Sequence, residues 1–140
     1  MLIPDTLGLF CAPSHSLAGR KRLAFGEAAG QAWICRAISS PFVREILEML
    51  TDAGIETART EIAAVGETMT LLRILSQGRH LAVLPCYPAV HLSQWFPLVQ
   101  LALDVEPRER NLYLWCRASS LDSPSFVAVK ETITGIAQAG

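Results

Sequence analysis

The fold of this 140-residue chain is most constrained by residues 81–84, a continuous apolar run of Leu-Ala-Val-Leu. A strand with one solvated face alternates apolar and polar residues, so an unbroken apolar run indicates a strand that is covered on both faces. Residues 69–75 carry apolar side chains at three- and four-residue spacing, which predicts a helix before this strand, and Gly78 ends it. A helix that leads into a doubly covered strand is typical of α/β proteins.

The chain upstream repeats the alternation of strand and helix. Residues 32–35 are apolar and residues 57–65 alternate in part, so we predict strands there. Between them, the Ser-Ser-Pro triplet at residues 39–41 provides an N-cap serine before a proline at the first helical position, and Gly54 provides a C-cap. We therefore predict a helix over residues 41–53 and a doubled βαβ unit with a parallel sheet.

Both ends of the chain carry further elements. Residues 7–11 predict a strand, and residues 23–30 predict one short helical turn. Residues 98–103 and 112–117 predict two strands, and the short polar link between them indicates an antiparallel hairpin. An amphipathic helix is predicted over residues 123–139. The predicted fold class is α/β, with a mainly parallel sheet flanked by helices, a terminal antiparallel hairpin and a C-terminal helix.

Composition excludes several classes of protein. Hydrophobic residues make up 51% of the chain and charged residues 18%, which indicates one compact domain. The formal net charge of -1 provides no basic surface for nucleic acid and no basic tail for a membrane. No apolar run approaches the roughly 20 residues of a membrane span. Residues 1–5 lack the pattern of a secretory signal, so we expect a cytoplasmic protein with four reduced, buried cysteines.

The sequence contains no motif of catalysis, cofactor binding or metal binding. It has no Gly-x-Ser-x-Gly, P-loop or dinucleotide fingerprint, and its cysteines form no Cys-x-x-Cys pair. His15, His80 and His91 are too widely spaced for a zinc site. We therefore expect no catalytic residues, no metal and no cofactor. A catalytic set that assembles in space from distant residues is the alternative, and it would make the chain a small α/β enzyme.

Four ordered stretches resemble the second lobe of the effector-binding domain of LysR-type transcriptional regulators. They are LGLFCAPSHSLAGRKRLAFGEAAGQAWI, SSPFVREILEMLTDAGI, GETMTLLRILSQGRHLAVLP and LYLWCRASSLDSPSFVAVKETI. The third stretch is the strongest match, and it departs from the family at Arg79 and His80, where a small or apolar residue and a second glycine are usual. Each stretch alone is a common α/β pattern, whereas the ordered set of four is much more specific.

This resemblance implies a periplasmic-binding-protein-like fold and a domain that senses a small-molecule effector to control transcription. It implies one truncated domain, with a crossing strand at residues 7–12, a second lobe at residues 13–118 and a C-terminal helix at residues 123–139. The family's helix-turn-helix and most of its first lobe have no counterpart in the sequence. DNA would be bound only by the helix-turn-helix of a parent protein. A solute-binding protein of the same fold is the alternative.

The expected effector site lies at the carboxyl ends of the parallel strands, where open α/β sheets bind ligands. Helix N-termini that follow such strands present free N–H groups to a ligand. In the family, the effector lies between the two lobes, and the second lobe supplies loops at these strand ends. The predicted effector-binding residues follow the three strands and are Arg36, Ser39, Ser40, Gly66, Glu67, Thr68 and Tyr87.

Most of these residues also have a purely structural interpretation. Ser40 would be a helix cap instead of a ligand-binding residue. Arg36 would be a solvated or salt-bridged surface residue. The Glu67 carboxylate would repel an acidic effector, so it either favours a cationic or hydroxylic ligand or faces away. Tyr87 contacts either the ligand or the core. Cys86 would serve as a redox sensor, as in one branch of the family, only with an exposed thiol of low pKa.

Self-association is the second interaction that we expect. The predicted C-terminal helix has an apolar face formed by Phe126, Val127, Ile133 and Ile136, and the lobe that covers it in the family is absent. Since an uncovered apolar face marks an interface, we expect the helix to join a second copy of the chain or to be repositioned. The resemblance adds a dimer surface on the helix over residues 41–53 and the strand that follows it.

Overall fold

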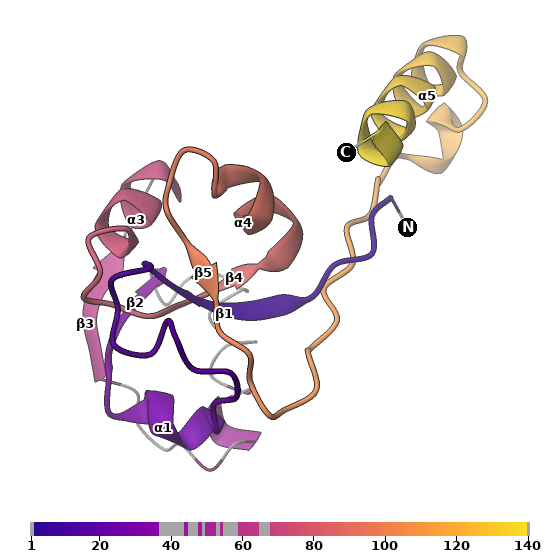
Figure 1. Cartoon of the computed structure of the whole chain (residues 1–140). Coiled ribbons are helices and arrows are strands. Elements are labelled where there is room, and N and C mark those ends of the chain that lie inside the picture. The colour runs from indigo at the N-terminus through magenta and orange to yellow at the C-terminus, as the bar shows by residue number, and fades with distance from the viewer. Residues whose placement is uncertain are drawn as a thin grey trace.

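The computed structural model describes residues 2–36, 44, 48, 50–52, 54, 59–64 and 68–139 (Figure 1). Its elements, in chain order, are β1 (Leu7–Cys11), α1 (Phe25–Ala29), β2 (Ala32–Arg36), β3 (Arg59–Ala64), α3 (Thr68–Leu75), β4 (Ala82–Pro85), α4 (Cys86–Leu92), β5 (Val99–Gln100), a 3-10 turn η1 (Ala118–Ser120) and α5 (Pro124–Ala139). Of the helix predicted over residues 41–53, the described residues 44, 48 and 50–52 are helical, and the rest lies outside the described residues. None of the helices so described is long and apolar enough to cross a membrane.

The predicted doubled βαβ unit forms the parallel half of the sheet. β2 pairs in parallel with β3. A parallel bridge between Trp33 and Leu81 then brings the start of β4 to the other edge of β2. Two backbone hydrogen bonds hold this bridge, because the amide of Leu81 donates to the Ala32 carbonyl and the amide of Ile34 donates to the Leu81 carbonyl, each at 2.9 Å. The three strands therefore end at the same edge of the sheet.

The other half of the sheet is antiparallel, which corrects the prediction of a mainly parallel sheet. β1 lies between β4 and β5 and runs antiparallel to both of them. The α/β class is confirmed, but the sheet is mixed. The cause is pairing between residues that are distant in sequence, since β1 precedes β4 by more than seventy residues and a local pattern cannot register such a pair.

The predicted hairpin between residues 98–103 and 112–117 is wrong. β5 pairs with β1, whereas Leu112 forms an antiparallel bridge with Ile3, and Glu109 forms one with Thr6. The polar link that was expected to turn back instead runs extended beside the N-terminal residues. Both predicted strands pair instead with the N-terminal part of the chain: β5 pairs with β1, and residues 109–112 pair with residues 3–6.

The central strands are buried on both faces, as the apolar run predicts. Along β4, Val83 packs in one hydrophobic cluster, while Ala82 and Leu84 pack in the other. β1 does the same, with Leu9 on one face and Phe10 on the opposite face. Because successive side chains of a strand point to opposite faces, the two clusters lie on the two sides of one sheet.

The cysteines correct one further prediction. Burial raises the pKa of the Cys11 thiol to about 11, so this thiol is neutral, as expected of a core residue. Cys35 and Cys86 are half-buried, however, and Cys116 is exposed, so the four are not uniformly buried. All four are free thiols.

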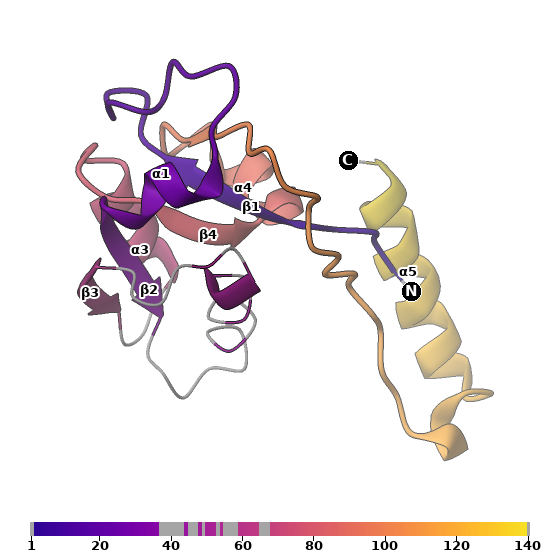
Figure 2. The ribbon, with the colours of Figure 1, turned by 90° about the horizontal axis from the view of Figure 1, so that it is seen from below.

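The C-terminal helix stands apart from the sheet. Residues 2–6 and 107–116 leave the sheet together as extended segments, and α5 lies at their far end (Figure 1 and Figure 2). The predicted cap of α5 is present, because the Phe126 amide donates to Ser123 Oγ at 3.2 Å. Near this helix, Trp115 is 86% exposed and Ile136 is 70% exposed. The end of the chain therefore presents large apolar side chains to solvent.

Replacing Gly78 by alanine is expected to lower the free energy of unfolding by about 2 kcal/mol, because the change imposes backbone strain. Gly78 has a φ of 92°, which residues with a side chain rarely adopt, and an added Cβ would collide with Ser14 Oγ. Urea denaturation measures the loss. Gly19→Ala is the matched control, since nothing lies within 4 Å of its added Cβ. Equal losses in the two variants would contradict this account.

The stability of the chain is expected to fall as the pH drops below about 6.5. Burial, and secondarily repulsion from His80, hold the pKa of His15 below its ordinary value of 6.5. The unfolded chain then takes up a proton that the folded chain accepts only at lower pH, so stability is full above the unfolded pKa and is lost on acidification through this window.

Urea denaturation above and below that pH measures this effect in the wild type and in His15→Asn. The asparagine amide oxygen replaces the acceptor that His15 Nδ1 offers to the Leu17 amide at 3.2 Å. This variant is expected to lose part of the pH dependence, whereas His91→Asn, at an exposed position, keeps it. An unchanged slope in His15→Asn would contradict the assignment.

Candidate functional site

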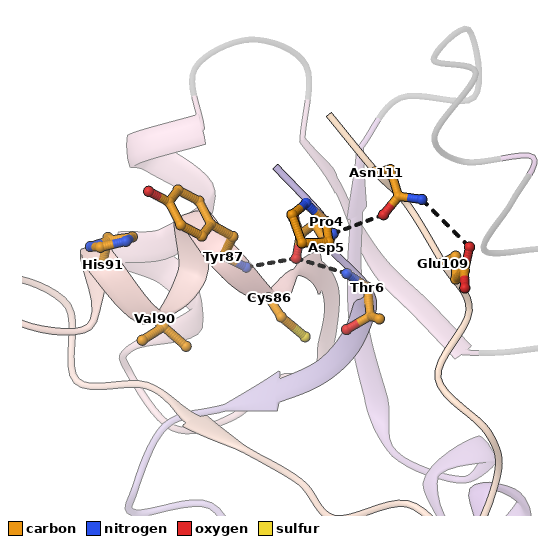
Figure 3. A pocket seen from close by; sticks show the side chains of 9 residues that line it. All are labelled: Pro4, Asp5, Thr6, Cys86, Tyr87, Val90, His91, Glu109 and Asn111. Atoms are coloured by element: carbon orange, nitrogen blue, oxygen red, sulfur yellow. Dashed lines mark hydrogen bonds between the residues drawn. The ribbon is translucent and has the colours of Figure 1, made fainter. Parts of the chain in front are cut away.

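A cavity of about 520 Å³ lies where β4 ends and α4 begins (Figure 3). Three segments enclose it: the stretch that leads into β1, the first turns of α4, and the extended stretch after residue 108. Its lining residues are Pro4, Asp5 and Thr6 from the first segment, Cys86, Tyr87, Val90 and His91 from the second, and Glu109 and Asn111 from the third. The cavity thus lies at the carboxyl end of a central strand, the edge at which sheets of this class bind ligands.

Backbone pairing holds the first and third segments together. The amide of Arg110 donates to the Asp5 carbonyl at 2.8 Å, and the amide of Leu112 donates to the Ile3 carbonyl at 2.8 Å. Two residues further along, the amide of Leu7 donates to the Arg108 carbonyl at 2.9 Å. These hydrogen bonds form an antiparallel ribbon that runs from the sheet toward α5.

Asp5 connects all three segments, through its side chain and its backbone. Its Oδ1 accepts hydrogen bonds from the amides of Thr6 and Tyr87, each at 2.8 Å, and the Asp5 amide donates to Asn111 Oδ1 at 3.1 Å (Figure 3). Asp5 is only 7% exposed. Its other oxygen, Oδ2, is shut off from solvent and has no hydrogen-bond partner among the described residues.

Two aromatic side chains on α4 form one wall of the cavity. Tyr87 and His91 are four residues apart, so they lie on the same face of the helix. Their ring centroids are 4.5 Å apart and the rings meet edge to face at 63°. Val90, on the same helix, adds an exposed apolar side chain to the lining.

The Cys86 thiol is packed toward the sheet. Its Sγ accepts a hydrogen bond from Gln100 Nε2 at 3.4 Å. Gly8 leaves room for it, since a Cβ at that position would come within 2.8 Å of Sγ. The thiol is thus half-buried beside β1 and β5, at the wall of the cavity.

Negative charge dominates the lining. Asp5 and Glu109 contribute carboxylates, and none of the nine described lining residues is a lysine or an arginine. Arg108 is adjacent in sequence, but its guanidinium pairs with Glu48 at 3.1 Å and with Asp52 at 2.9 Å. Across the part of the chain that the structure describes, no group of three or more His, Cys, Asp or Glu side chains is placed to hold a metal ion.

Of the seven predicted site residues, Tyr87 lies in the cavity wall. Arg36 ends β2 and Thr68 begins α3, at the same edge of the sheet, and neither lines the cavity. Thr68 is exposed. The remaining four, Ser39, Ser40, Gly66 and Glu67, lie outside the described residues.

Sequence analysis missed the residues that join the cavity to the chain's N-terminal segment, above all Asp5, Glu109 and Asn111. The hydrogen bond between Asp5 and Asn111 spans 106 positions. The available signal was weak: Asp5 is a single acidic residue directly before an apolar strand, where burial of a carboxylate requires partners.

Solved structures of bacterial regulators share this fold. The CcmR regulatory domain of Synechocystis PCC6803, in complex with 2-PG, has a TM-score of 0.70 at 15% identity over 95% of this chain and 64% of its own. The MetR regulatory domain of N. meningitidis has a TM-score of 0.70 at 16% identity over 99% of this chain and 65% of its own. The effector binding domain of QuiR, in complex with shikimate, has a TM-score of 0.64 at 16% identity over 99% of this chain and 64% of its own. The chain therefore spans slightly less than two thirds of these domains.

Sequence comparison provides the family. No curated protein matches the chain in sequence. The profile of the LysR substrate binding domain matches residues 2–137, nearly the whole length. The match agrees with the mixed sheet, the cavity at its edge and the structural relatives. The chain belongs to the LysR substrate binding domain family.

Proposed function

We propose that this chain is the ligand-sensing part of a LysR-type transcriptional regulator and that a small-molecule effector binds in the cavity between Asp5, Tyr87 and Asn111. The observation that carries the proposal is the cavity itself, about 520 Å³, at the carboxyl end of β4. Its volume falls within the usual range for small-molecule sites. The family match and the ligand complexes of CcmR and QuiR support the same function.

The position of the cavity suggests how binding is transmitted. The ribbon of residues 2–6 and 107–112 contributes one wall, and the same ribbon leads out to α5 (Figure 2). A ligand that contacts both the ribbon and α4 stabilises one orientation of the ribbon relative to the sheet. A ligand shifts such an equilibrium only by its difference in affinity for the two orientations, so these contacts are what convert binding into a signal.

The role that we propose is binding, and no catalytic step is part of it. Asp5 Oδ1 is occupied by two amides, and the Cys86 thiol bonds to Gln100. Neither group is therefore placed as a free base or nucleophile toward the cavity. In the proposed regulator, DNA is bound by a helix-turn-helix elsewhere in a parent protein, and the domain acts in the cytoplasm with its target DNA. We prefer a regulator's sensing domain to the two alternatives, a solute-binding protein of the same fold and a small α/β enzyme.

The remaining predicted residues stay in the proposal as an outer part of the site. β2, β3 and β4 end at one edge of the sheet. We propose that the residues that end β2 or follow β2 and β3 in sequence also contribute to the site: Arg36, Ser39, Ser40, Gly66, Glu67 and Thr68. Their contribution would enlarge the site beyond the cavity described above.

Filling the cavity is expected to abolish effector binding. Val90→Trp places a bulky ring in the lining at a position that is 58% exposed, so the fold tolerates it. In a thermal-shift screen of small metabolites, compounds that stabilise the wild type are expected to lose about tenfold or more in affinity for this variant. Val129→Trp on α5 is the matched control, because Val129 is 52% exposed and lies outside the cavity. Compounds that stabilise Val90→Trp as well as the wild type would refute the assignment.

We also propose that the C-terminal part of the chain associates with a second copy. Its exposed apolar side chains are Leu112, Tyr113, Leu114, Trp115, Leu121, Val127, Val129 and Ile136. Tyr113 and Trp115 form a ring contact at 6.2 Å, which gives this surface an aromatic centre. Aromatic side chains of this kind are enriched at protein interfaces. The dimer surface over residues 41–53 remains part of the proposal.

Replacing Trp115 and Ile136 by serine is expected to shift the chain toward the monomer. Each change removes apolar area that would be buried between copies, and light scattering coupled to gel filtration measures the mass at several concentrations. Trp95→Ser is the control, since Trp95 is 67% exposed but lies next to α4. A wild type that stays monomeric at every concentration would rule out this interface.

A further inference from the structure

We propose that the effector carries a positively charged nitrogen, an ammonium or an amidinium group, which binds between Asp5 and Glu109. The inference rests on the proposed function and states the chemical class of ligand for the same cavity. It follows from three independent features: a buried carboxylate oxygen, the charge of the lining, and the aromatic wall.

The buried carboxylate of Asp5 favours a positive charge nearby. The amides of Thr6 and Tyr87 donate to Oδ1, whereas Oδ2 has no partner among the described residues and is shut off from solvent. Burial without a partner is costly for a charged oxygen. A ligand in the cavity does not touch Oδ2 itself, but a positive charge beside Asp5 stabilises the buried carboxylate by Coulomb attraction, which is strong where water is excluded.

The charge of the cavity favours a cation. Glu109 lies opposite Thr6, the neighbour of Asp5, on the paired segment, and its carboxylate accepts a long hydrogen bond of 3.5 Å from Asn111 Nδ2 (Figure 3). The described lining holds no lysine or arginine to balance the two carboxylates, and Arg108 pairs with Glu48 and Asp52. An acidic ligand would add a third negative charge here, and like charges brought together at an interface oppose binding.

The aromatic wall fits the same ligand. Tyr87 presents a ring to the cavity beside His91, and the Val90 side chain is close by on the same helix (Figure 3). The face of a tyrosine ring attracts an ammonium group, and an apolar side chain packs against a hydrocarbon body. We therefore expect a small aliphatic amine, with its charged nitrogen between the carboxylates and its carbon chain along α4.

Three probes with the same four-carbon skeleton test the charge. The ¹⁵N-labelled full chain is titrated with 1,4-diaminobutane, 1,4-butanediol and succinate, and the amide resonances of Thr6 and Tyr87 are followed, because both amides donate to Asp5. The diamine is expected to shift both resonances in a saturable manner, and to bind about tenfold or more tightly than succinate.

Substitution of the carboxylates assigns the effect to residues. Asp5→Asn keeps an Oδ1 acceptor for the two amides and removes the charge, so it is expected to weaken diamine binding about tenfold. Glu109→Gln, at an exposed position, is expected to weaken binding about threefold without affecting the fold. Asp104→Asn is the matched control, since Asp104 is an exposed aspartate outside the cavity, and it is expected to change binding by less than about twofold.

The outcomes separate the two proposals. Succinate or butanediol that binds this cavity as tightly as the diamine overturns the cationic class and leaves the effector cavity in place. If Asp104→Asn weakens diamine binding as much as Asp5→Asn and Glu109→Gln do, the assignment to this carboxylate pair is overturned. If the diamine shifts neither the Thr6 nor the Tyr87 resonance, the cationic class fails, while the metabolite screen with Val90→Trp decides separately whether the cavity binds an effector.

Discussion

The Asp5 carboxylate is the contact on which the geometry of the site depends. One oxygen accepts the amides of Thr6 and Tyr87, and the Asp5 backbone is bonded on both sides to the segment around Asn111. Three segments that are about eighty and one hundred residues apart in sequence therefore meet at one residue. Its second oxygen is buried and has no partner among the described residues, so the residue that joins the segments also holds an uncompensated charge beside the cavity. The ligand class that we propose rests on this charge.

The sheet provides the rigid support that this contact needs. β1 and β4 are paired along four positions and carry apolar side chains on both faces, so the strand ends that meet at the cavity are held from both sides. The extended ribbon that leaves the sheet has no such cover, and it ends at a helix with exposed apolar side chains (Figure 2). A well-packed sheet is thus joined to a less covered ribbon, with the cavity at the junction, and the proposed transmission of binding depends on this arrangement.

The elements themselves were largely predictable because their signals are local. The apolar run over residues 81–84, the cap at Ser123 and the helix stop at Gly78 each depend on a few neighbouring residues, and the structure has β4, α5 and the end of α3 at these places. The hairpin was wrong because strand pairing depends on competition among all available edges. Residues 98–103 and 112–117 are close in sequence, but they pair with β1 and with the segment before it. Of the predicted site residues, Tyr87, which follows a buried strand, lines the cavity.

What the sequence determined by itself was the class of fold and the common edge at which its parallel strands end, because periodicity and capping act over a single turn or strand and parallel strands end together. What only the tertiary structure decided was the composition of the site. Asp5, Glu109 and Asn111 belong to no motif, and they meet only because two segments near opposite ends of the chain pair in an antiparallel ribbon. The charge of the cavity, and therefore the kind of ligand it favours, is a property of that long-range pairing. No local pattern records it, since the free energy of such contacts depends on which distant segments come together.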